Sequence, residues 1–214
     1  MKKIIFLLLI SILFIECNSD DTEADQNQRG NNLFAFKENE LPNTNFISKI
    51  IEIDQANGNE TTILEFNNNE YIESFVFNSE TNEILGVGND DKLYKINTET
   101  RTFTTINLDN SESIIYQLVI GNDNRLFAFK ENELPNTNFI NKVIEIDQVN
   151  GNETTILEFS NNEHVESLVF NSETNEILGV GNDDKLYKIN TETRTFTTIN
   201  LDNSESIIYQ LVIK

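Results

Sequence analysis

Few residues in this chain belong to the types that carry out most protein chemistry. Its 214 residues include one histidine, His164, one cysteine, Cys17, and no tryptophan. Imidazole and thiolate groups supply many general bases, nucleophiles and zinc ligands, and the segment around His164 occurs a second time with Tyr71 in its place. No His, Asp and Glu cluster has zinc-ligand spacing. The sequence therefore predicts no catalytic residues and favours a protein that is not an enzyme.

Carboxylates are the abundant functional groups. Asp and Glu number 36 against 15 Lys and Arg, which gives a net charge of −21 at pH 7. A surface that binds nucleic acid needs clustered basic residues to neutralise phosphates, so we expect no nucleic acid partner. Carboxylate oxygens suit hard cations such as Ca²⁺. The composition therefore excludes one class of partner and keeps a metal-ion site open.

The N-terminal residues have the pattern of a secretion signal. Lys2 and Lys3 precede an apolar run over residues 4–15 that only Ser11 interrupts. A helix needs about 20 apolar residues to span a bilayer, so this run is too short for a membrane anchor. We predict a signal peptide over residues 1–16.

The residues after this signal indicate how the protein is held. Cys17 follows directly, and the next six residues are Asn-Ser-Asp-Asp-Thr-Glu. This pattern resembles the signal of surface lipoproteins of the Bacteroidetes, which implies a lipid on Cys17 and a location at the outer membrane or cell surface. Residues 18–32 contain no large apolar side chain and read as a disordered acidic tether. Residues 17–32 are therefore expected to hold the folded domain to the membrane through the lipid alone.

An internal repeat decides the fold. Residues 33–120 match residues 126–213 at a constant offset of 93, with seven differences. Each copy holds two weaker repeats of about 50 and 40 residues, a length typical of solenoids and propeller blades. Each unit contains short runs rich in Ile, Val, Phe, Thr and Tyr between Asn, Asp and Gly clusters, which is the pattern of strands and turns. Four strands recur per unit, for example over residues 71–77, 84–87, 93–96 and 102–106.

The segment 77–100 contains Gly-Val-Gly-Asn-Asp-Asp-Lys-Leu-Tyr-Lys-Ile-Asn-Thr-Glu-Thr. It resembles the blades of WD-repeat-like and lactonase-like β-propellers. The resemblance implies an all-β fold, a propeller of four blades with four antiparallel strands each. Residues 33–214 are expected to form it from two near-identical copies, residues 33–125 and 126–214.

The two ends of the propeller region are complementary. The first unit starts at residues 33–36 as a second strand without an inner strand before it, and residues 207–213 form an inner strand with nothing after it. We predict that the C-terminal strand completes the first blade, which removes the free edges of the ring. Because one chain would close its own ring, we expect the protein to be a monomer. The alternative is a strand-exchanged dimer, in which near-identical copies combine into a larger ring.

The predicted inner strands place carboxylates at equivalent positions. Glu73 and Glu166 align with Tyr116 and Tyr209, and strand alternation would direct this set toward the central channel. Glu73 and Glu166 are therefore candidate ligands of a Ca²⁺ ion, the only cofactor that the sequence suggests. The alternative is a polar, water-filled channel.

Long loops define a second candidate site. The loop over residues 38–48 and its copy from Glu131 lengthen two of the four units. Phe46 and Phe139 stand in these polar loops beside Asn45 and Asn138, and an exposed ring is a suitable binding anchor. Tyr71 and His164 differ between the copies and map to the same mouth of the ring. The alternative is that each Phe packs against its own blade.

Together these features predict a lipid-anchored, extracytoplasmic β-propeller that acts as a binding or interaction module. Its ligand would be a protein, a peptide or a glycan, held at the mouth that the long loops frame. Two alternatives stay open. One is a metal-dependent hydrolase or lactonase-like enzyme with Glu73 and Glu166 as ligands, and the other is a structural spacer or assembly subunit.

Overall fold

The computed structural model describes the repeat region and leaves out the N-terminal segment. The described residues are 33–39, 47–66, 70–108, 113–132, 141–159, 165–202 and 211–213. The predicted signal peptide, Cys17 and the tether lie outside these ranges. Within them, no helix has the length and apolar character needed to cross a bilayer.

The described residues form strands and one short 3-10 helix, η1 (Asn122–Asn124). The strands of the first copy are β1 (Leu33–Asn39), β2 (Ile47–Ile53), β3 (Glu60–Phe66), β4 (Ile72–Asn78), β5 (Glu83–Gly88), β6 (Lys92–Asn97), β7 (Thr102–Asn107) and β8 (Ser113–Ile120). Those of the second copy are β9 (Leu126–Asn132), β10 (Asn141–Ile146), β11 (Glu153–Phe159), β12 (Val165–Asn171), β13 (Glu176–Gly181), β14 (Lys185–Asn190) and β15 (Thr195–Asn200).

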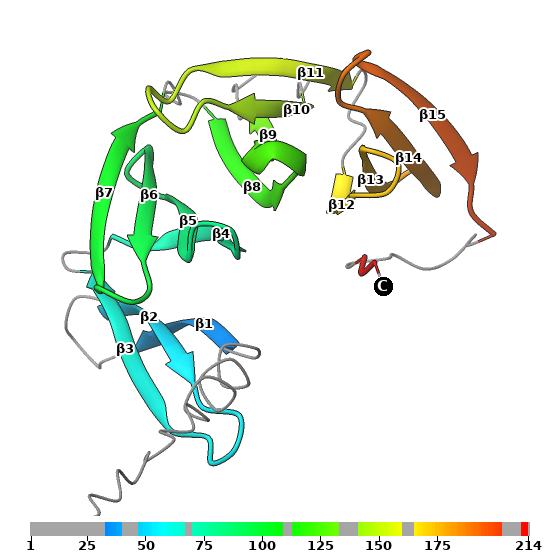
Figure 1. The fold of residues 1–214 in the computed structure, drawn as a ribbon. Helices are drawn as coiled ribbons and strands as arrows, with labels where there is room; N and C mark the ends of the chain where they lie inside the picture. Colours follow the sequence, from blue (N-terminus) through cyan, green and yellow to red (C-terminus); the bar gives the residue numbers. More distant parts are fainter. Residues whose placement is uncertain are drawn as a thin grey trace, which may run out of the picture.

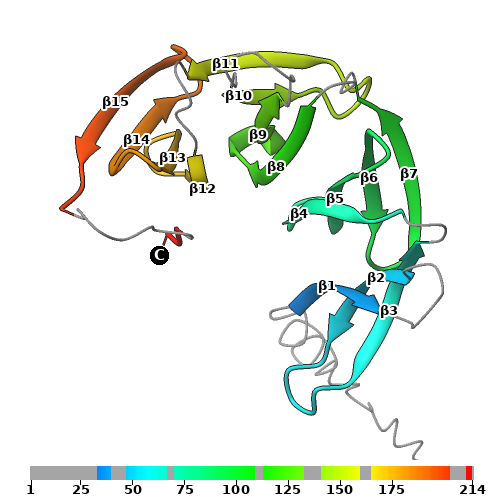
Figure 2. The ribbon, with the colours of Figure 1, turned by 180° about the vertical axis from the view of Figure 1, so that it is seen from behind.

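These strands form four antiparallel sheets. The strand orders are β1-β2-β3, β4-β5-β6-β7, β8-β9-β10-β11 and β12-β13-β14-β15. Strands β4, β8 and β12 lie toward the inside of an arc, and β3, β7, β11 and β15 lie on its outside (Figures 1 and 2). The predicted blades are therefore confirmed, and β8 crosses from the first copy to start the sheet of the second.

The first sheet has three strands in the described part of the chain. The sequence predicts that residues 207–213 complete it. Residues 203–210 lie outside the described ranges, and residues 211–213 are not part of a strand. The described sheets form an open arc with β1 near one end and the C-terminal residues near the other (Figure 1). Closure of the ring by the C-terminal strand therefore stays a prediction.

Three hydrophobic cores hold the arc together, one at each junction between neighbouring sheets. The first junction buries Ile50 and Phe66 against Tyr94, the second buries Leu85 against Leu126, and the third uses aromatic residues such as Phe159 and Tyr187. Middle strands such as β5 are buried along nearly their whole length because both faces of the sheet are covered. The middle strand β5 is therefore nearly all apolar, whereas the outer strand β7 is mostly exposed.

Asparagine side chains close two equivalent turns. The Asn97 side chain accepts hydrogen bonds from the backbone N–H groups of Glu99 (3.0 Å) and Thr100 (2.8 Å). Asn190 makes the same bonds in the second copy. An Asn side chain in this arrangement replaces a backbone turn hydrogen bond. Asn97 and Asn190 therefore close the tight turns that join β6 to β7 and β14 to β15.

Candidate functional site

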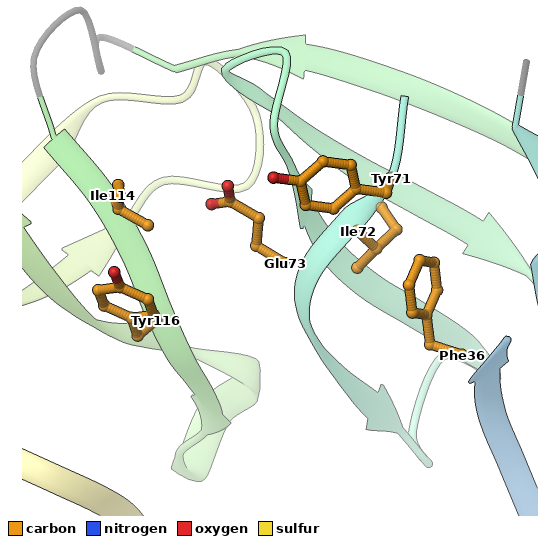
Figure 3. Close-up of a pocket in the computed structure, with 6 residues that line it drawn as sticks. All are labelled: Phe36, Tyr71, Ile72, Glu73, Ile114 and Tyr116. Atoms are coloured by element: carbon orange, nitrogen blue, oxygen red, sulfur yellow. The ribbon is translucent and has the colours of Figure 1, made fainter. Parts of the chain in front are cut away.

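A pocket lies on the inner side of the arc, between the first and second sheets and β8. Its volume is about 660 Å³, within the range of about 300–1,000 Å³ that is common for small-molecule sites. Six described residues line it: Phe36, Tyr71, Ile72, Glu73, Ile114 and Tyr116 (Figure 3). They come from β1, from β4 and the residue before it, and from β8, so three strands that are distant in sequence build one site.

Glu73 occupies an irregular position in β4. Ile72 pairs with Gly88 and Ser74 pairs with Val87, so Glu73 is the extra residue between two paired positions. Such a bulge leaves one residue outside the ladder and redirects its side chain. The carboxylate of Glu73 consequently projects into the space between β4 and β8 (Figure 3). Its neighbour Ile72 remains in the core at 4% exposure.

The backbone of Tyr71 is held just before β4. Its N–H donates a 3.0 Å hydrogen bond to the Asn89 side chain, and the N–H of Asn89 donates one of 3.0 Å to the Tyr71 carbonyl. Gly88, the last residue of β5 and the partner of Ile72, leaves no room for a side chain, because a Cβ atom there would lie 2.6 Å from Asp90 Oδ1 and 2.8 Å from the Tyr94 ring. Tyr71 is 38% exposed as a residue, and its side chain borders the pocket.

Strand β8 supplies the opposite wall. The Ser74 hydroxyl accepts a 3.0 Å hydrogen bond from the N–H of Leu118, which ties β4 to β8. β8 has its own irregularity against β9, between Tyr116 and Leu118, and the intervening Gln117 has a φ of 50°. This irregularity follows Tyr116 directly and shifts the strand at the pocket. Irregular pairing on both β4 and β8 therefore shapes the site.

The six described lining residues combine one carboxylate with three aromatic rings and two isoleucines, and none of them is basic. Aromatic faces attract cations through their quadrupole, and a carboxylate forms its strongest hydrogen bonds with charged donors. The site is therefore suited to a guanidinium or ammonium group with an apolar stem. Among the described residues, no group of three or more His, Cys, Asp or Glu side chains could hold a metal ion.

From the sequence, Tyr71 was predicted to lie at the mouth framed by the long loops, and Glu73 was predicted to face a central channel. The structure places both in one pocket. Glu166 belongs to β12, whereas Cys17, Asn45, Phe46, Asn138, Phe139 and His164 lie outside the described residues. The sequence analysis did not select Phe36, Ile72 or Ile114. The alignment of residues 71–77 with residues 114–120 was the available signal, because it marks two inner strands that lie side by side.

Neither a protein-family model nor a curated protein sequence matches this chain. Several solved structures are similar to this chain. An oligogalacturonate lyase from Vibrio parahaemolyticus is 14% identical over 81% of this chain and 50% of that chain, with a TM-score of 0.56. An oligogalacturonate lyase in complex with manganese is 10% identical over 78% of this chain and 60% of that chain, with a TM-score of 0.55. The β-propeller domain of Cps50 (Swd1) from Myceliophteria thermophila is 10% identical over 72% and 55%, with a TM-score of 0.50.

These similarities define the class of the protein. It is an all-β protein with the β-propeller fold, as the repeat pattern of its sequence predicted. The chain spans between half and 60% of the length of the neighbours it matches. The neighbours include an enzyme and a propeller domain of another kind, and identities of 10–14% carry the fold alone.

Proposed function

We propose that this propeller is an extracytoplasmic binding module that receives a basic side chain of a protein or peptide partner in the pocket at Glu73. The observation that carries the proposal is the combination of the Glu73 carboxylate with Tyr71, Tyr116 and Phe36 around one pocket of about 660 Å³. A lysine or arginine side chain has an apolar stem and a charged head. The stem would contact the rings and the head would reach the carboxylate.

The charge of the whole chain supports the same class of partner. With a net charge of −21, the protein attracts basic partners over distance and repels acidic ones, which raises the rate of productive encounters. Acidic glycans and nucleic acids are disfavoured for the same reason. A lipid on Cys17 would hold the module at the outer membrane or cell surface. Phe46 and Phe139 in the long loops, with the adjacent Asn45 and Asn138, would add contacts to the partner outside the pocket.

Fluorescence anisotropy with a labelled hexa-arginine peptide tests this function. The peptide should bind the full chain, and the substitution Glu73→Gln should weaken binding by about tenfold or more, because it removes the charged acceptor of the guanidinium hydrogen bonds. Glu173→Gln is the matched control. Glu173 is exposed in the turn after β12, so the control changes the net charge equally without touching the pocket.

An equal loss of affinity in both variants would contradict the proposal, since it would mean that only the overall charge matters. Binding of a neutral oligosaccharide in place of the peptide, abolished by Tyr71→Ala, would assign the pocket to a glycan. Full affinity in every variant would leave only the role of a spacer or assembly subunit for this face of the propeller.

A metal-dependent enzyme is the second candidate. One structural neighbour is an oligogalacturonate lyase in complex with manganese, and Glu73 and Glu166 are the carboxylates that the sequence offers as ligands for a cation. A cation bound to the folded state raises the unfolding temperature by mass action. A rise in Tm with micromolar Ca²⁺ or Mn²⁺ that disappears in the double variant Glu73→Gln/Glu166→Gln would favour this candidate over the binding module.

A further inference from the structure

Strand β1 has one paired edge and one open edge in the described part of the chain. It pairs with β2, whereas β9, which has the identical sequence Leu-Phe-Ala-Phe-Lys-Glu-Asn, pairs with β10 on one side and with β8 on the other. An open strand edge presents a row of N–H and C=O groups to any chain that can pair with it. The two copies thus show the same strand with an inner neighbouring strand, as in β9, and without one, as in β1.

The missing neighbour changes the burial of β1. Leu33 is 49% exposed, whereas its equivalent Leu126 is fully buried. The Lys37 side chain is 43% exposed in its ion pair with Glu60, and the equivalent Lys130 is 10% exposed in its pair with Glu153. Because the sequences are identical, the difference comes from the neighbours of β9, which are β8 and the second sheet with Leu85. β1 is an apolar edge that a β8-like strand would cover.

The chain contains a second copy of the β8 sequence. Residues 206–213 read Ser-Ile-Ile-Tyr-Gln-Leu-Val-Ile, identical to β8 over its whole length. The β8–β9 pairing fixes the register that such a strand would adopt on β1. Ile120 lies opposite Leu126, and Tyr116 lies opposite Phe129. By equivalence, Ile213 would lie opposite Leu33, and Tyr209 would lie opposite Phe36.

The described end of this segment lies beside the fourth sheet. The N–H of Leu211 donates a 2.9 Å hydrogen bond to the Ser167 hydroxyl of β12. It is the counterpart, 93 residues later, of the bond from Leu118 to Ser74 that places β8 next to β4. Leu211 therefore has the position of the inner strand of a next blade after the fourth sheet. β1 of the same chain lies at the other end of the open arc (Figures 1 and 2).

We propose that two copies of this chain join head to tail, each pairing its residues 206–213 with the open edge of β1 in the other copy. The exchange completes the first blade of each copy, and two sets of four blades make eight, the upper end of the usual range of about 4–8 blades. Three copies would exceed that range. The two contacts are equivalent, so the ring closes with no free edge.

The exchange would also change the wall of the pocket at β1. Phe36 lines the pocket from β1, and the inferred register sets Tyr209 of the second copy opposite it. Phe129, the equivalent of Phe36 beside β8, is fully buried, so the exchange would cover Phe36 and leave the β4 and β8 residues of one chain to face a ligand. This assembly does not depend on which ligand the pocket receives, and its test uses no ligand. A failure of the dimer is therefore distinguishable from a failure of the proposed binding function.

Disulfide formation between single-cysteine variants tests the proposal. The full chain is purified in mild detergent with Cys17→Ser as background, and Leu33→Cys and Ile213→Cys are prepared as separate variants. Opposed residues of antiparallel strands have Cα atoms about 4.5–5.5 Å apart, within the span of a disulfide. Mixing the two variants under mild oxidation should give a disulfide-linked heterodimer, since a self-closed chain cannot join them.

Lys37→Cys mixed with Ile213→Cys is the out-of-register control, because four residues along a strand separate the sites by about 13 Å. A link that forms only in one chain carrying both Leu33→Cys and Ile213→Cys would overturn the proposal in favour of self-closure. The absence of a disulfide in both the mixture and the double variant would also overturn the proposal. So would a control mixture that forms as much disulfide as the mixture of Leu33→Cys and Ile213→Cys. Sedimentation of the Cys17→Ser chain adds a second measurement, with twice the chain mass of 24.6 kDa expected and the single mass contradicting the dimer.

Discussion

The hydroxyl group of Tyr187 donates a 2.9 Å hydrogen bond to Asp183 Oδ2, and Tyr94 makes the same bond, of 3.0 Å, to Asp90. In both copies a lysine two residues after the aspartate also contacts that oxygen. The other oxygen, Oδ1, is buried without a hydrogen-bond partner in both aspartates. Tyr187 is 2% exposed and packs edge-on against Phe159. The tyrosine therefore links the core between blades to the turn that precedes its strand.

Replacing this hydroxyl should lower the stability of the protein. Tyr187→Phe keeps the ring in the core and removes a donor from a carboxylate that already has one unpaired oxygen, so we expect a loss of about 1.5–3 kcal/mol in the free energy of unfolding. Urea denaturation measures it. Tyr71→Phe is the control, because the Tyr71 ring is exposed at the pocket. Equal effects of the two substitutions would show that the Asp183 bond contributes nothing.

The stability should depend on pH through Asp183. Burial raises the pKa of the Asp183 carboxyl, but hydrogen bonds from Lys185 and Tyr187 outweigh burial and place the pKa below its ordinary value. A carboxyl with a lowered folded-state pKa stabilises the protein above its unfolded pKa of about 4 and loses that contribution as pH falls through the folded pKa. The stability difference between the parent and Asp183→Asn should be steady from about pH 7 to 5 and shrink below about pH 4.

Denaturation of both proteins across this pH range checks the expectation. The exposed Glu173→Gln serves as a charge-matched control, because lowering the pH also relieves the repulsion among the many acidic residues. A difference that follows the same pH curve for Asp183→Asn and Glu173→Gln would assign the effect to net charge instead of the hydrogen bonds.

Arg125 joins the third and fourth sheets. Its Nε and Nη2 atoms each donate a 2.8 Å hydrogen bond to Glu145 of β10, and Nη1 contacts Glu192 in the turn between β14 and β15. The hydrogen bond from Arg125 lowers the pKa of Glu145 despite its partial burial. Lysine cannot reproduce the two-pronged bond, so Arg125→Lys should cost about 1 kcal/mol in urea denaturation. Lys49→Arg, in the single-bond ion pair with the more exposed Glu65, should change stability by less than about 0.5 kcal/mol.

Two equivalent glycines give a test of how blades meet. Gly58 and Gly151 both have positive φ angles, 74° and 78°. A Cβ atom at Gly151 would lie 2.2 Å from the Asn107 carbonyl of the neighbouring sheet, whereas none of the described atoms lies within 4 Å of one at Gly58. Gly58→Ala should cost about 1–2 kcal/mol from the backbone conformation alone, and Gly151→Ala should cost a further ~1–3 kcal/mol from the overlap.

Urea denaturation at low protein concentration measures this pair. In the proposed dimer, Gly58 of one copy would meet the second copy's equivalent of Asn107, which is Asn200. Gly58→Ala should then also raise the concentration at which the dimer dissociates, as sedimentation would record. Equal costs for the two substitutions in the dissociated chain would contradict the blade contact at Gly151.

Much of the fold follows from the sequence. Residues 84–87, 93–96 and 102–106 were predicted as strands and are the central parts of β5, β6 and β7. These predictions hold because apolar runs and Asn or Asp turns act over a few residues, and side chains such as Asn97 close their turns locally. The count of blades follows from the repeat for the same reason.

The candidate site was harder to predict from the sequence than the fold. Regular alternation would send successive side chains of β4 to opposite faces of the sheet, but the bulge at Glu73 redirects one of them. The bulge depends on how β4 pairs with β5 across the hairpin, which the residues of β4 by themselves do not specify. The partnership of Tyr71 and Glu73 with Phe36, Ile114 and Tyr116 likewise depends on where β1 and β8 lie.

Strands β1 and β9 show which features the sequence determines by itself and which features depend on the tertiary structure. Seven identical residues determine the same strand and the same pairing with the next strand in both copies. Only the tertiary structure decides that Leu126 is fully buried while Leu33 is 49% exposed, because Leu126 packs against β8 and the second sheet, which other parts of the chain supply. Local propensity fixes the element, whereas burial and an open edge depend on contacts between distant segments.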